Sequence, residues 1–298
     1  MITPTTSAPT DNDLAAAAED ETLRRVRYLA PNAITTVNLL FGMASLVAAS
    51  DGRWAFAGWM IIYAVLCDRI DGLVARRLHA TSAFGVQLDS FADFLNFGVA
   101  PAFLVYSYLT ARIDLPYGAG APRVLLMLGC AAWTCCAVFR LARYNVLAED
   151  ATPTKIFFGV PSTMAGGMLT MWFLVLLKYE HAGPTFGGPK LFGGDVEVAR
   201  WVWLYSPIPM VLLGLLMVSS LPMPKGGGGA RKAVVAFLAL AMLSGYVLGF
   251  AQKMPEVAAF MPTIWLAVFL VWGQVSSTGR GFHPPRLFPA PVRPAKRR

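Results

Sequence analysis

Long apolar stretches recur along the whole chain, and their length constrains the fold more than any other feature of the sequence. A helix needs roughly 20 predominantly apolar residues to cross the hydrocarbon core of a bilayer, and this chain supplies about eight such stretches. With 56% hydrophobic residues, only 14% charged residues and a mean hydropathy of +0.55, the sequence is too apolar for the surface of a water-soluble globule. We therefore predict an all-α, polytopic membrane protein.

The predicted spans divide into a main body and an extension. We place about eight transmembrane helices at 33–50, 54–77, 83–109, 123–147, 158–178, 201–221, 231–251 and 256–274. The predicted organisation is a disordered tail (1–22), a six-helix membrane core with an N-terminal interfacial helix (23–224), a Gly-rich linker (225–230), two additional transmembrane helices (231–275) and a basic, Pro-rich tail (276–298). The interfacial helix is expected to end before Pro31, because the residue before a proline disfavours helical geometry.

The net charge of +8 is distributed in a way that indicates a membrane surface, not a nucleic acid, as the partner. Basic residues crowd the approach to the first span and the C-terminal tail, as anionic lipids and the positive-inside rule favour. An even number of spans puts both termini on one side, and most basic residues fall there. We expect cytoplasmic termini in a membrane of the bacterial inner-membrane type, since the external loops are short and no targeting segment is recognisable.

Four aspartates lie within two consecutive predicted spans, where ionisable side chains are costly and mark functional sites. Asp68 and Asp71 share one face of the second span, and Asp89 and Asp93 share one face of the third. If these helices form an antiparallel hairpin centred on 79–81, Asp71 reaches the depth of Asp89, and Asp68 that of Asp93. The four carboxylates then converge about 10–20 Å from the turn, at ~1.5 Å rise per residue, near the cytoplasmic headgroup boundary.

Clustered carboxylates repel one another, so their convergence requires compensation. Salt bridges from nearby arginines and protonation are two alternatives. Oxygen-only ligand sets, however, suit Mg²⁺ or Mn²⁺, and an acidic cluster can hold two ions that clamp a reacting phosphate. The small residues Gly72, Ala75 and Gly85 lie on the same faces, where they either let a ligand approach the backbone or let helices pack closely. The cysteines and histidines show no spacing typical of a metal site.

A signature of eight fixed residues spans these positions: Asp68-x2-Asp71-Gly72-x2-Ala75-Arg76-x8-Gly85-x3-Asp89-x3-Asp93. It resembles the complete signature of the CDP-alcohol phosphotransferases. The resemblance implies a six-helix membrane core, often homodimeric, that binds a CDP-linked donor and two divalent ions and transfers a phosphate-containing group to an alcohol with release of CMP. It also implies roles for individual residues: Asp68, Asp71 and Asp89 as metal ligands, with Asp93 completing the second site, and Gly72, Ala75, Arg76 and Gly85 on the donor side. We expect Asp93 to be the general base as well. Thr35 and Asn38 are expected to add hydrogen bonds to the diphosphate, and the alternative for the asparagine is a bond to another helix.

Flanking segments resemble the branch of the family whose donor is CDP-diacylglycerol and whose acceptor is L-serine. These segments are Thr35-x2-Asn38-Leu39 with Gly42, Leu88 to Asp93 followed by Phe97-Gly98-Val99-Ala100-Pro101, Arg140-Leu141-Ala142-Arg143-Tyr144-Asn145, and Phe158-Gly159-Val160-Pro161. Because guanidinium groups bind carboxylates bidentately, Arg140 and Arg143 are expected to receive the serine carboxylate, with Asn145, although such arginines also anchor a span. Glycerol phosphate, inositol phosphate and choline are alternative acceptors, and a cation or proton pathway is an alternative from a different class.

Overall fold

The structure is a computed structural model of the whole chain. It describes residues 11–78, 82–149, 156–180, 186–193, 196–224, 240, 243–245 and 247–275. Outside these residues lie the predicted linker (225–230), most of the predicted span 231–251, the predicted C-terminal tail (276–298) and the first ten residues of the predicted N-terminal tail.

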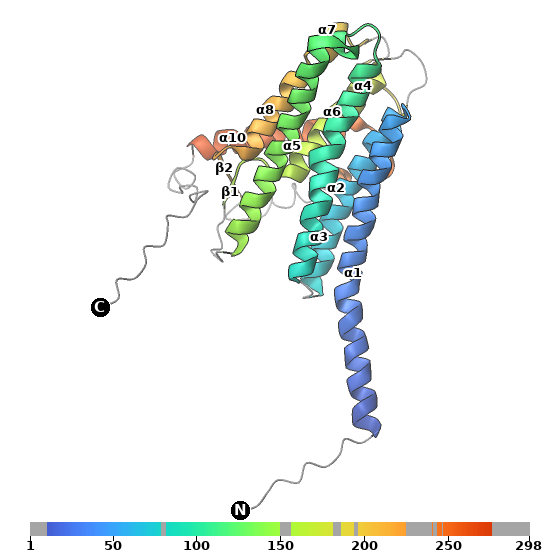
Figure 1. Cartoon of the computed structure of the whole chain (residues 1–298), viewed down its shortest axis with the longest axis vertical. Helices are drawn as coiled ribbons and strands as arrows, with labels where there is room; N and C mark the ends of the chain where they lie inside the picture. Colours follow the sequence, from blue (N-terminus) through green and yellow to red (C-terminus); the bar gives the residue numbers. More distant parts are fainter. Residues whose placement is uncertain are drawn as a thin grey trace, which may run out of the picture.

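Helices form nearly all of the described chain (Figure 1). In order they are α1 (Asp11–Ser50), α2 (Trp54–Arg77), α3 (Ala83–Asp93), the π-helix η1 (Phe94–Val99), α4 (Ala100–Ala111), the 3₁₀ turn η2 (Pro116–Gly118), α5 (Gly120–Glu149), α6 (Ser162–Tyr179), α7 (Arg200–Tyr205), α8 (Pro207–Val218) and α10 (Pro255–Val275). The strands β1 (Ile156–Phe158) and β2 (Pro222–Pro224) pair antiparallel. The predicted all-α class is confirmed, with this short ribbon as its one addition among the described residues.

Helix α1 is longer than the sequence indicated. It runs unbroken from Asp11 to Ser50 with Pro31 inside it, so the expected disorder up to residue 22 and the expected break before Pro31 are both absent from the described residues. Proline removes one backbone donor and disfavours a helical residue before it. The second half of α1 packs on α2, α3 and α4, and this burial stabilises the helix beyond the proline.

Helix α1 also organises the end of the bundle that carries the aspartates. Helices α2 and α3 each pack on α1 rather than along each other, so the predicted hairpin is looser than a packed helix pair. In Figure 1 the C-terminal end of α2 and the start of α3 lie together at one end of the bundle, and α7 lies at the other. The acidic residues are therefore carried on two helices that are both held by α1.

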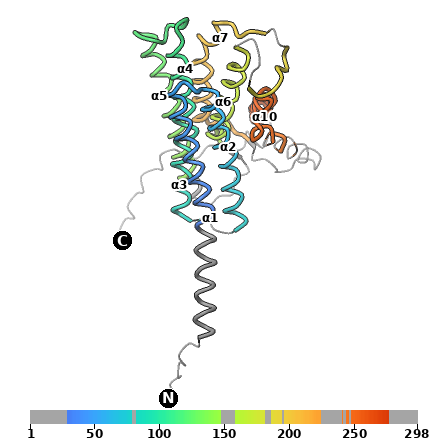
Figure 2. Tube along the Cα trace, turned by 90° about the vertical axis from the view of Figure 1, so that its right-hand side faces the viewer, coloured from blue at the N-terminus to red at the C-terminus, as the bar shows by residue number. Residues whose placement is uncertain are grey.

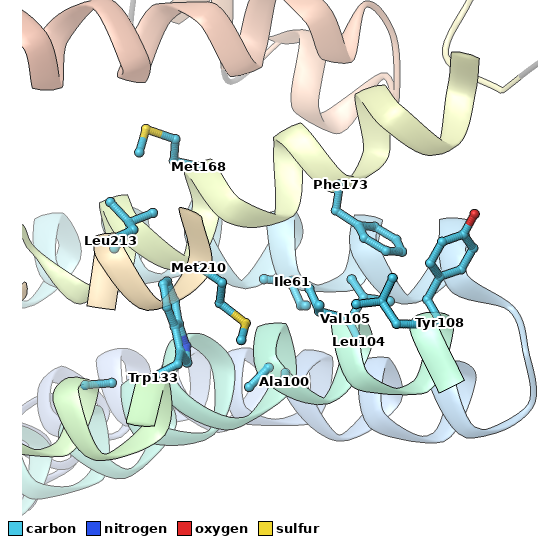
Figure 3. Close-up of a cluster of buried hydrophobic side chains, with 14 of the residues drawn as sticks. Ile61, Ala100, Leu104, Val105, Tyr108, Trp133, Met168, Phe173, Met210 and Leu213 are labelled. Carbon is cyan, nitrogen blue, oxygen red and sulfur yellow. The ribbon is translucent and has the colours of Figure 1, made fainter. Parts of the chain in front are cut away.

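The apolar core lies between α2, α4, α5, α6 and α8 (Figure 3). Trp133 and Ile61 are fully buried in it, whereas large apolar side chains on the outer faces of α1, α5 and α8 are exposed, among them Leu125 (70%) and Phe139 (63%). Five helices in the described part are long and apolar enough to cross a membrane: Leu29–Ser50, Ala83–Ala111, Gly120–Val146, Arg200–Val218 and Pro255–Val275. Exposed apolar faces on spanning helices contact lipid, and the chain is an integral membrane protein.

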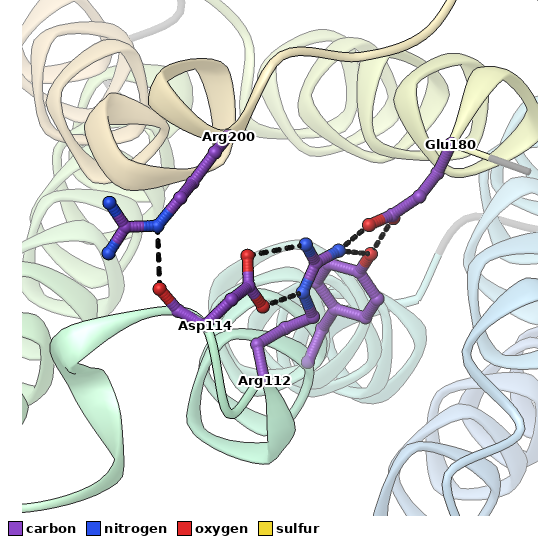
Figure 4. Close-up of polar contacts among 5 residues, drawn as sticks. Arg112, Asp114, Glu180 and Arg200 are labelled. Carbon is purple, nitrogen blue, oxygen red and sulfur yellow. Dashed lines mark hydrogen bonds and ion pairs between the residues drawn. The ribbon is translucent and has the colours of Figure 1, made fainter.

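A network of charged side chains joins α4, α6 and α7 at the end opposite the aspartates (Figure 4). Arg112 pairs with Asp114 at 2.7 Å and also with Glu180, which accepts from the Tyr108 hydroxyl. Arg200 donates from Nε to the backbone carbonyl of Asp114 at 2.6 Å. The hydrogen bonds from Arg112 hold the pKa of the Asp114 carboxyl below its usual range. These contacts fix the helix ends that face away from the acidic site.

The last described helix, α10, packs against α6, on the side away from α5 (Figure 2). Near its start, Glu256 forms a fully buried ion pair with Lys178 of α6, with 2.8 Å between Nζ and Oε1. Further along, Trp172 donates to Thr263 at 2.9 Å. Near its end, Gly273 abuts the carbonyl of Pro222 in β2 so closely that a Cβ would clash. Helix α10 is thus a packed part of the bundle.

Candidate functional site

Three of the four predicted aspartates meet between α2 and α3. Carboxylate oxygens of Asp68, Asp71 and Asp89 all lie within 4.8 Å of one another. Asp71 is 3% exposed, and the other two are partly buried. The convergence predicted from helical spacing is therefore correct for these three residues. The reason is that each pair lies two to three turns from the end of its helix, so both pairs sit at similar depth.

The fourth aspartate, Asp93, lies beside this cluster. Its carboxyl group is within electrostatic reach of Asp68, Asp89 and Arg140, and it is 8% exposed. Its Oδ1 atom is buried and has no hydrogen-bond partner among the described residues. A buried carboxylate oxygen without a partner is costly unless a ligand or a reacting group completes it. Asp93 is the last residue of α3, immediately before the π-helix η1, and such helices occur often at functional sites.

Helix α1 supplies two buried polar residues near the cluster, with different partners. The Thr35 hydroxyl lies 3.1 Å from Asp71 Oδ2, so it touches the acidic group directly. Asn38 instead accepts a hydrogen bond from Asn96 of η1 at 3.0 Å. A Cβ at Gly42 would overlap the side chain of Asn96, so this glycine makes room for the pair. Of the two expected donor-binding residues on this helix, Thr35 is placed at the site, while Asn38 joins α1 to η1.

The small residues of the signature separate into the two roles that the sequence left open. A Cβ at Gly85 would lie 2.9 Å from Oδ1 of Asn32, so Gly85 permits close packing of α3 on α1. Apart from the adjacent residues and the backbone of its own helix, a Cβ added at Gly72 would meet only the guanidinium of Arg76 within 4 Å in the described part, at 3.6 Å. The backbone at Gly72 is thus open to a ligand, with the exposed Arg76 beside it, and Ala75 lies partly buried on the same helix.

Arg140, near the end of α5, faces the acidic cluster. Its Nη1 donates to the hydroxyl of Ser162 at 3.0 Å, and its guanidinium carbon lies 5.3 Å from the ring centroid of Tyr144. No carboxylate among the described residues lies within ion-pair distance of Arg140. Asp93 and Asp68 are nevertheless near enough for an electrostatic interaction with it. Arg140 therefore presents a cation beside Asp93 while most of its donors stay available.

Arg143, one turn further along α5, is occupied differently from the prediction. Its guanidinium donates to three backbone carbonyls: Val218 at 3.0 Å, Phe158 at 2.7 Å and Ser219 at 3.1 Å. These carbonyls belong to the end of α8, the residue after it and the end of strand β1, so Arg143 ties the β-ribbon to α8. A guanidinium with such backbone partners complements the C-terminus of α8.

Asn145 connects α5 to the helix that carries Asp89. Its Nδ2 donates to the hydroxyl of Ser90 at 2.9 Å, and Ser90 follows Asp89 in α3. The structure therefore places Asn145 as a bridge between these helices, near the site but bonded to protein. Of the three expected acceptor residues, Arg140 is the one that faces the cluster and keeps hydrogen-bond donors available for a ligand.

The donor set fits a divalent cation. Three mutually close carboxylates and a fourth with an unpartnered buried oxygen offer only oxygen ligands, the kind that Mg²⁺ and Mn²⁺ prefer. The same arrangement without a cation would leave several negative charges within 5 Å, at a cost of a few kcal/mol for each pair. The acidic cluster is thus able to hold a metal ion.

Ser162 is a site residue that the sequence reasoning missed. It is fully buried and is the first residue of α6, directly after Pro161. A signal was present, because Ser162 follows the Phe158-Gly159-Val160-Pro161 segment already associated with the L-serine branch. Helical periodicity could not reveal its contact with Arg140, because the two residues belong to different helices.

Comparison with known proteins gives consistent results. The CDP-alcohol phosphatidyltransferase family matches residues 28–203, more than half of the chain. A CDP-diacylglycerol–serine O-phosphatidyltransferase of Helicobacter pylori is 30% identical over 83% of this chain and 90% of its own length. One from Mycobacterium bovis is 30% identical over 73% of this chain and 72% of its own. An archaetidylserine synthase of Methanothermobacter thermautotrophicus is 29% identical over 68% of this chain and 73% of its own.

Proposed function

Since the chain belongs to the CDP-alcohol phosphatidyltransferase family, we propose that it transfers the phosphatidyl group of CDP-diacylglycerol to the hydroxyl of L-serine. The products are phosphatidylserine and CMP. The observation that carries this proposal is the convergence of Asp68, Asp71 and Asp89 beside a partnerless Asp93 oxygen, with the Arg140 cation near it. Relatives that match most of the chain carry the name of this activity.

The four aspartates would hold the divalent cations, Mg²⁺ or Mn²⁺ and two in number, as the family resemblance implies. Such ions neutralise a diphosphate and stabilise the charge that develops on a leaving phosphate. The open backbone at Gly72 and the exposed Arg76 beside it would lie along the nucleotide, while Thr35 orients Asp71 through their contact. Ala75 and Gly85 complete this donor side, Gly85 by letting α3 approach α1.

Asp93 acts as the general base in this proposal. The serine oxygen attacks the phosphorus that carries the diacylglycerol group, the bond from that phosphorus to the CMP oxygen breaks, and the serine proton passes to Asp93. The buried, unpartnered Oδ1 of Asp93 suits this role, because a base must offer a free lone pair to the acceptor hydroxyl. Arg140 binds the serine carboxylate in two-point fashion, as its free donors allow.

Acceptor identity is tested by incubating the purified protein in lipid nanodiscs with CDP-diacylglycerol, Mg²⁺ or Mn²⁺ and one labelled acceptor at a time. We expect L-serine to give labelled lipid and stoichiometric CMP, and glycerol phosphate, inositol phosphate and choline to give neither. Labelled lipid from another acceptor alone would identify a sister activity. An absence of CMP release with every acceptor would refute the enzymatic proposal and favour a transport role.

The base is tested with Asp93→Asn, which keeps the shape of the side chain and removes its proton-accepting capacity. We expect turnover to fall by about 10²–10⁴-fold, the usual contribution of general base catalysis. Asp51→Asn is the matched control, because Asp51 is exposed in the turn between α1 and α2, at the other end of the bundle. Near-normal turnover in the Asp93 variant would assign the base to another residue.

The two arginines are expected to respond differently to replacement by glutamine. Arg140→Gln should raise the KM for L-serine, because it removes the cation beside Asp93. Arg143→Gln should lower thermal stability, because it leaves part-buried backbone carbonyls without their side-chain donor. If the Arg143 variant instead loses serine affinity while keeping its stability, the acceptor role belongs to Arg143.

The remaining expectations concern the environment of the enzyme. We propose that it works as a homodimer in a bacterial inner membrane, with both termini on the cytoplasmic side. The family resemblance supports the homodimer, and the distribution of basic residues supports the orientation. Labelling of single cysteines introduced near the two termini, in intact and opened cells, would test the orientation.

A further inference from the structure

We propose that Ser162 is a positioning residue that aims the Arg140 guanidinium at the acceptor carboxylate. The proposal rests on the proposed function, because it assigns Arg140 a substrate. Ser162 accepts a hydrogen bond from Nη1 of Arg140 at 3.0 Å and is itself fully buried. One contact at one terminal nitrogen leaves the other nitrogens of the guanidinium free for two-point binding of a carboxylate.

Arg140 needs such a support because a long side chain is mobile unless something fixes its end. Ordering an arginine side chain costs rotamer entropy, and a preformed contact removes that cost from substrate binding. The Tyr144 ring, 5.3 Å from the guanidinium carbon, limits the side chain on one side, and Ser162 fixes its end. Since no described carboxylate forms an ion pair with Arg140, its charge is held beside Asp93 without being neutralised.

The backbone that carries Ser162 is rigidly held. Gly159 has a φ of +74°, and a Cβ there would clash with the backbone carbonyls at the end of α8, so only glycine fits this approach. Its N–H donates to the carbonyl of Leu221 at 2.9 Å, and the N–H of Val160 donates to that of Leu216 at 3.1 Å. Arg143 donates to Phe158 at 2.7 Å. The segment before α6 is therefore anchored to α8 and β2.

The two arginines are thus connected through one chain of contacts and have different roles. Arg143 fixes the β-ribbon on α8, this fixed ribbon sets the start of α6, and the first residue of α6 fixes Arg140. The chain of contacts runs Arg143 to Phe158, through the turn at Gly159 to Ser162, and then to Arg140. The carboxylate of the acceptor is then received by an arginine whose end is already in place.

The experiment compares Ser162→Ala with Ser162→Thr, which keeps a hydroxyl, and with the control Thr170→Val. Thr170 lies on the same helix, is equally buried, and its hydroxyl has no hydrogen-bond partner among the described residues. The KM for L-serine, the KM for CDP-diacylglycerol, kcat and the preference for L-serine over L-serinamide are measured in nanodiscs. Serinamide keeps the reacting hydroxyl and lacks the carboxylate.

We expect Ser162→Ala to raise the KM for L-serine about tenfold, the size of effect expected when one hydrogen bond to a charged group is lost, and to lower the preference for L-serine over the amide. The KM for CDP-diacylglycerol and kcat should stay near wild type, Ser162→Thr should recover most of the serine affinity, and Thr170→Val should change nothing. An unchanged KM for L-serine in Ser162→Ala would overturn the proposal. A fall in kcat together with a rise in the KM values of both substrates would overturn it as well. Absence of serine transfer by the wild-type protein would instead refute the proposed function.

Discussion

Replacing one aspartate of the cluster should change the stability of the protein in opposite directions with and without divalent cations. The carboxylate oxygens of Asp68, Asp71 and Asp89 lie within 4.8 Å of one another. Two unit charges at that distance repel by about 3.5 kcal/mol at an effective dielectric constant near 20. Asp89→Asn removes two of the three pairings, which together amount to about 7 kcal/mol at this separation. Rotation of the side chains and water reduce this, so we expect about 1–2 kcal/mol.

With a chelator at pH 8, Asp89→Asn should therefore unfold a few degrees above the wild-type protein. When Mg²⁺ or Mn²⁺ is added, the order should reverse, because a ligand at 100 times its Kd stabilises the protein that binds it by about 2.7 kcal/mol. The assay is the thermal unfolding midpoint in detergent across a titration of the metal, with Asp51→Asn as the control that should follow wild type. The reasoning would be refuted if Asp89→Asn had a lower unfolding midpoint than wild type in chelator and if the wild-type midpoint did not change with the metal concentration.

Two further outcomes concern charges away from the site. Lys178→Met should lower the free energy of unfolding by about 3–5 kcal/mol, because it leaves Glu256 buried without its cation, whereas Lys178→Met with Glu256→Leu should recover most of the loss. Unfolding midpoints measure both, and a double variant as unstable as the single one would contradict the argument. The hydrogen bonds from Arg112 depress the pKa of Asp114 below its usual range. A carboxyl group whose pKa is depressed in the folded protein stabilises it at pH values above the unfolded pKa of about 3.9. This stability is lost as the pH falls through the folded pKa. Wild type should therefore lose more stability than Asp114→Asn between pH 5 and pH 3. Equal losses on acid titration would show that this pairing contributes nothing.

The spacing of charged residues in the sequence was enough to predict the acidic site. Helical periodicity puts Asp68 and Asp71 on one face and Asp89 on another at matching depth, and the structure brings their carboxylates together. The apolar stretches likewise determined the all-α membrane class, because no other fold satisfies backbone hydrogen bonds in lipid with such segments. Both predictions rest on local rules, a helix period and a bilayer thickness, that need no knowledge of neighbouring helices.

Which helices touch was decided only by the tertiary structure. The sequence pattern made Arg140 and Arg143 equivalent, yet one faces Asp93 and the other bonds to the carbonyls of β1 and α8. Residues three apart share a helix face, so the difference comes from the elements that pack at each level of α5. From the sequence, the last helix was expected to be an addition behind a flexible linker. In the structure α10 packs against α6, and a buried ion pair joins the two helices. Contacts between segments far apart in the chain depend on how whole helices pack, and the period of a single helix carries no information about its partner.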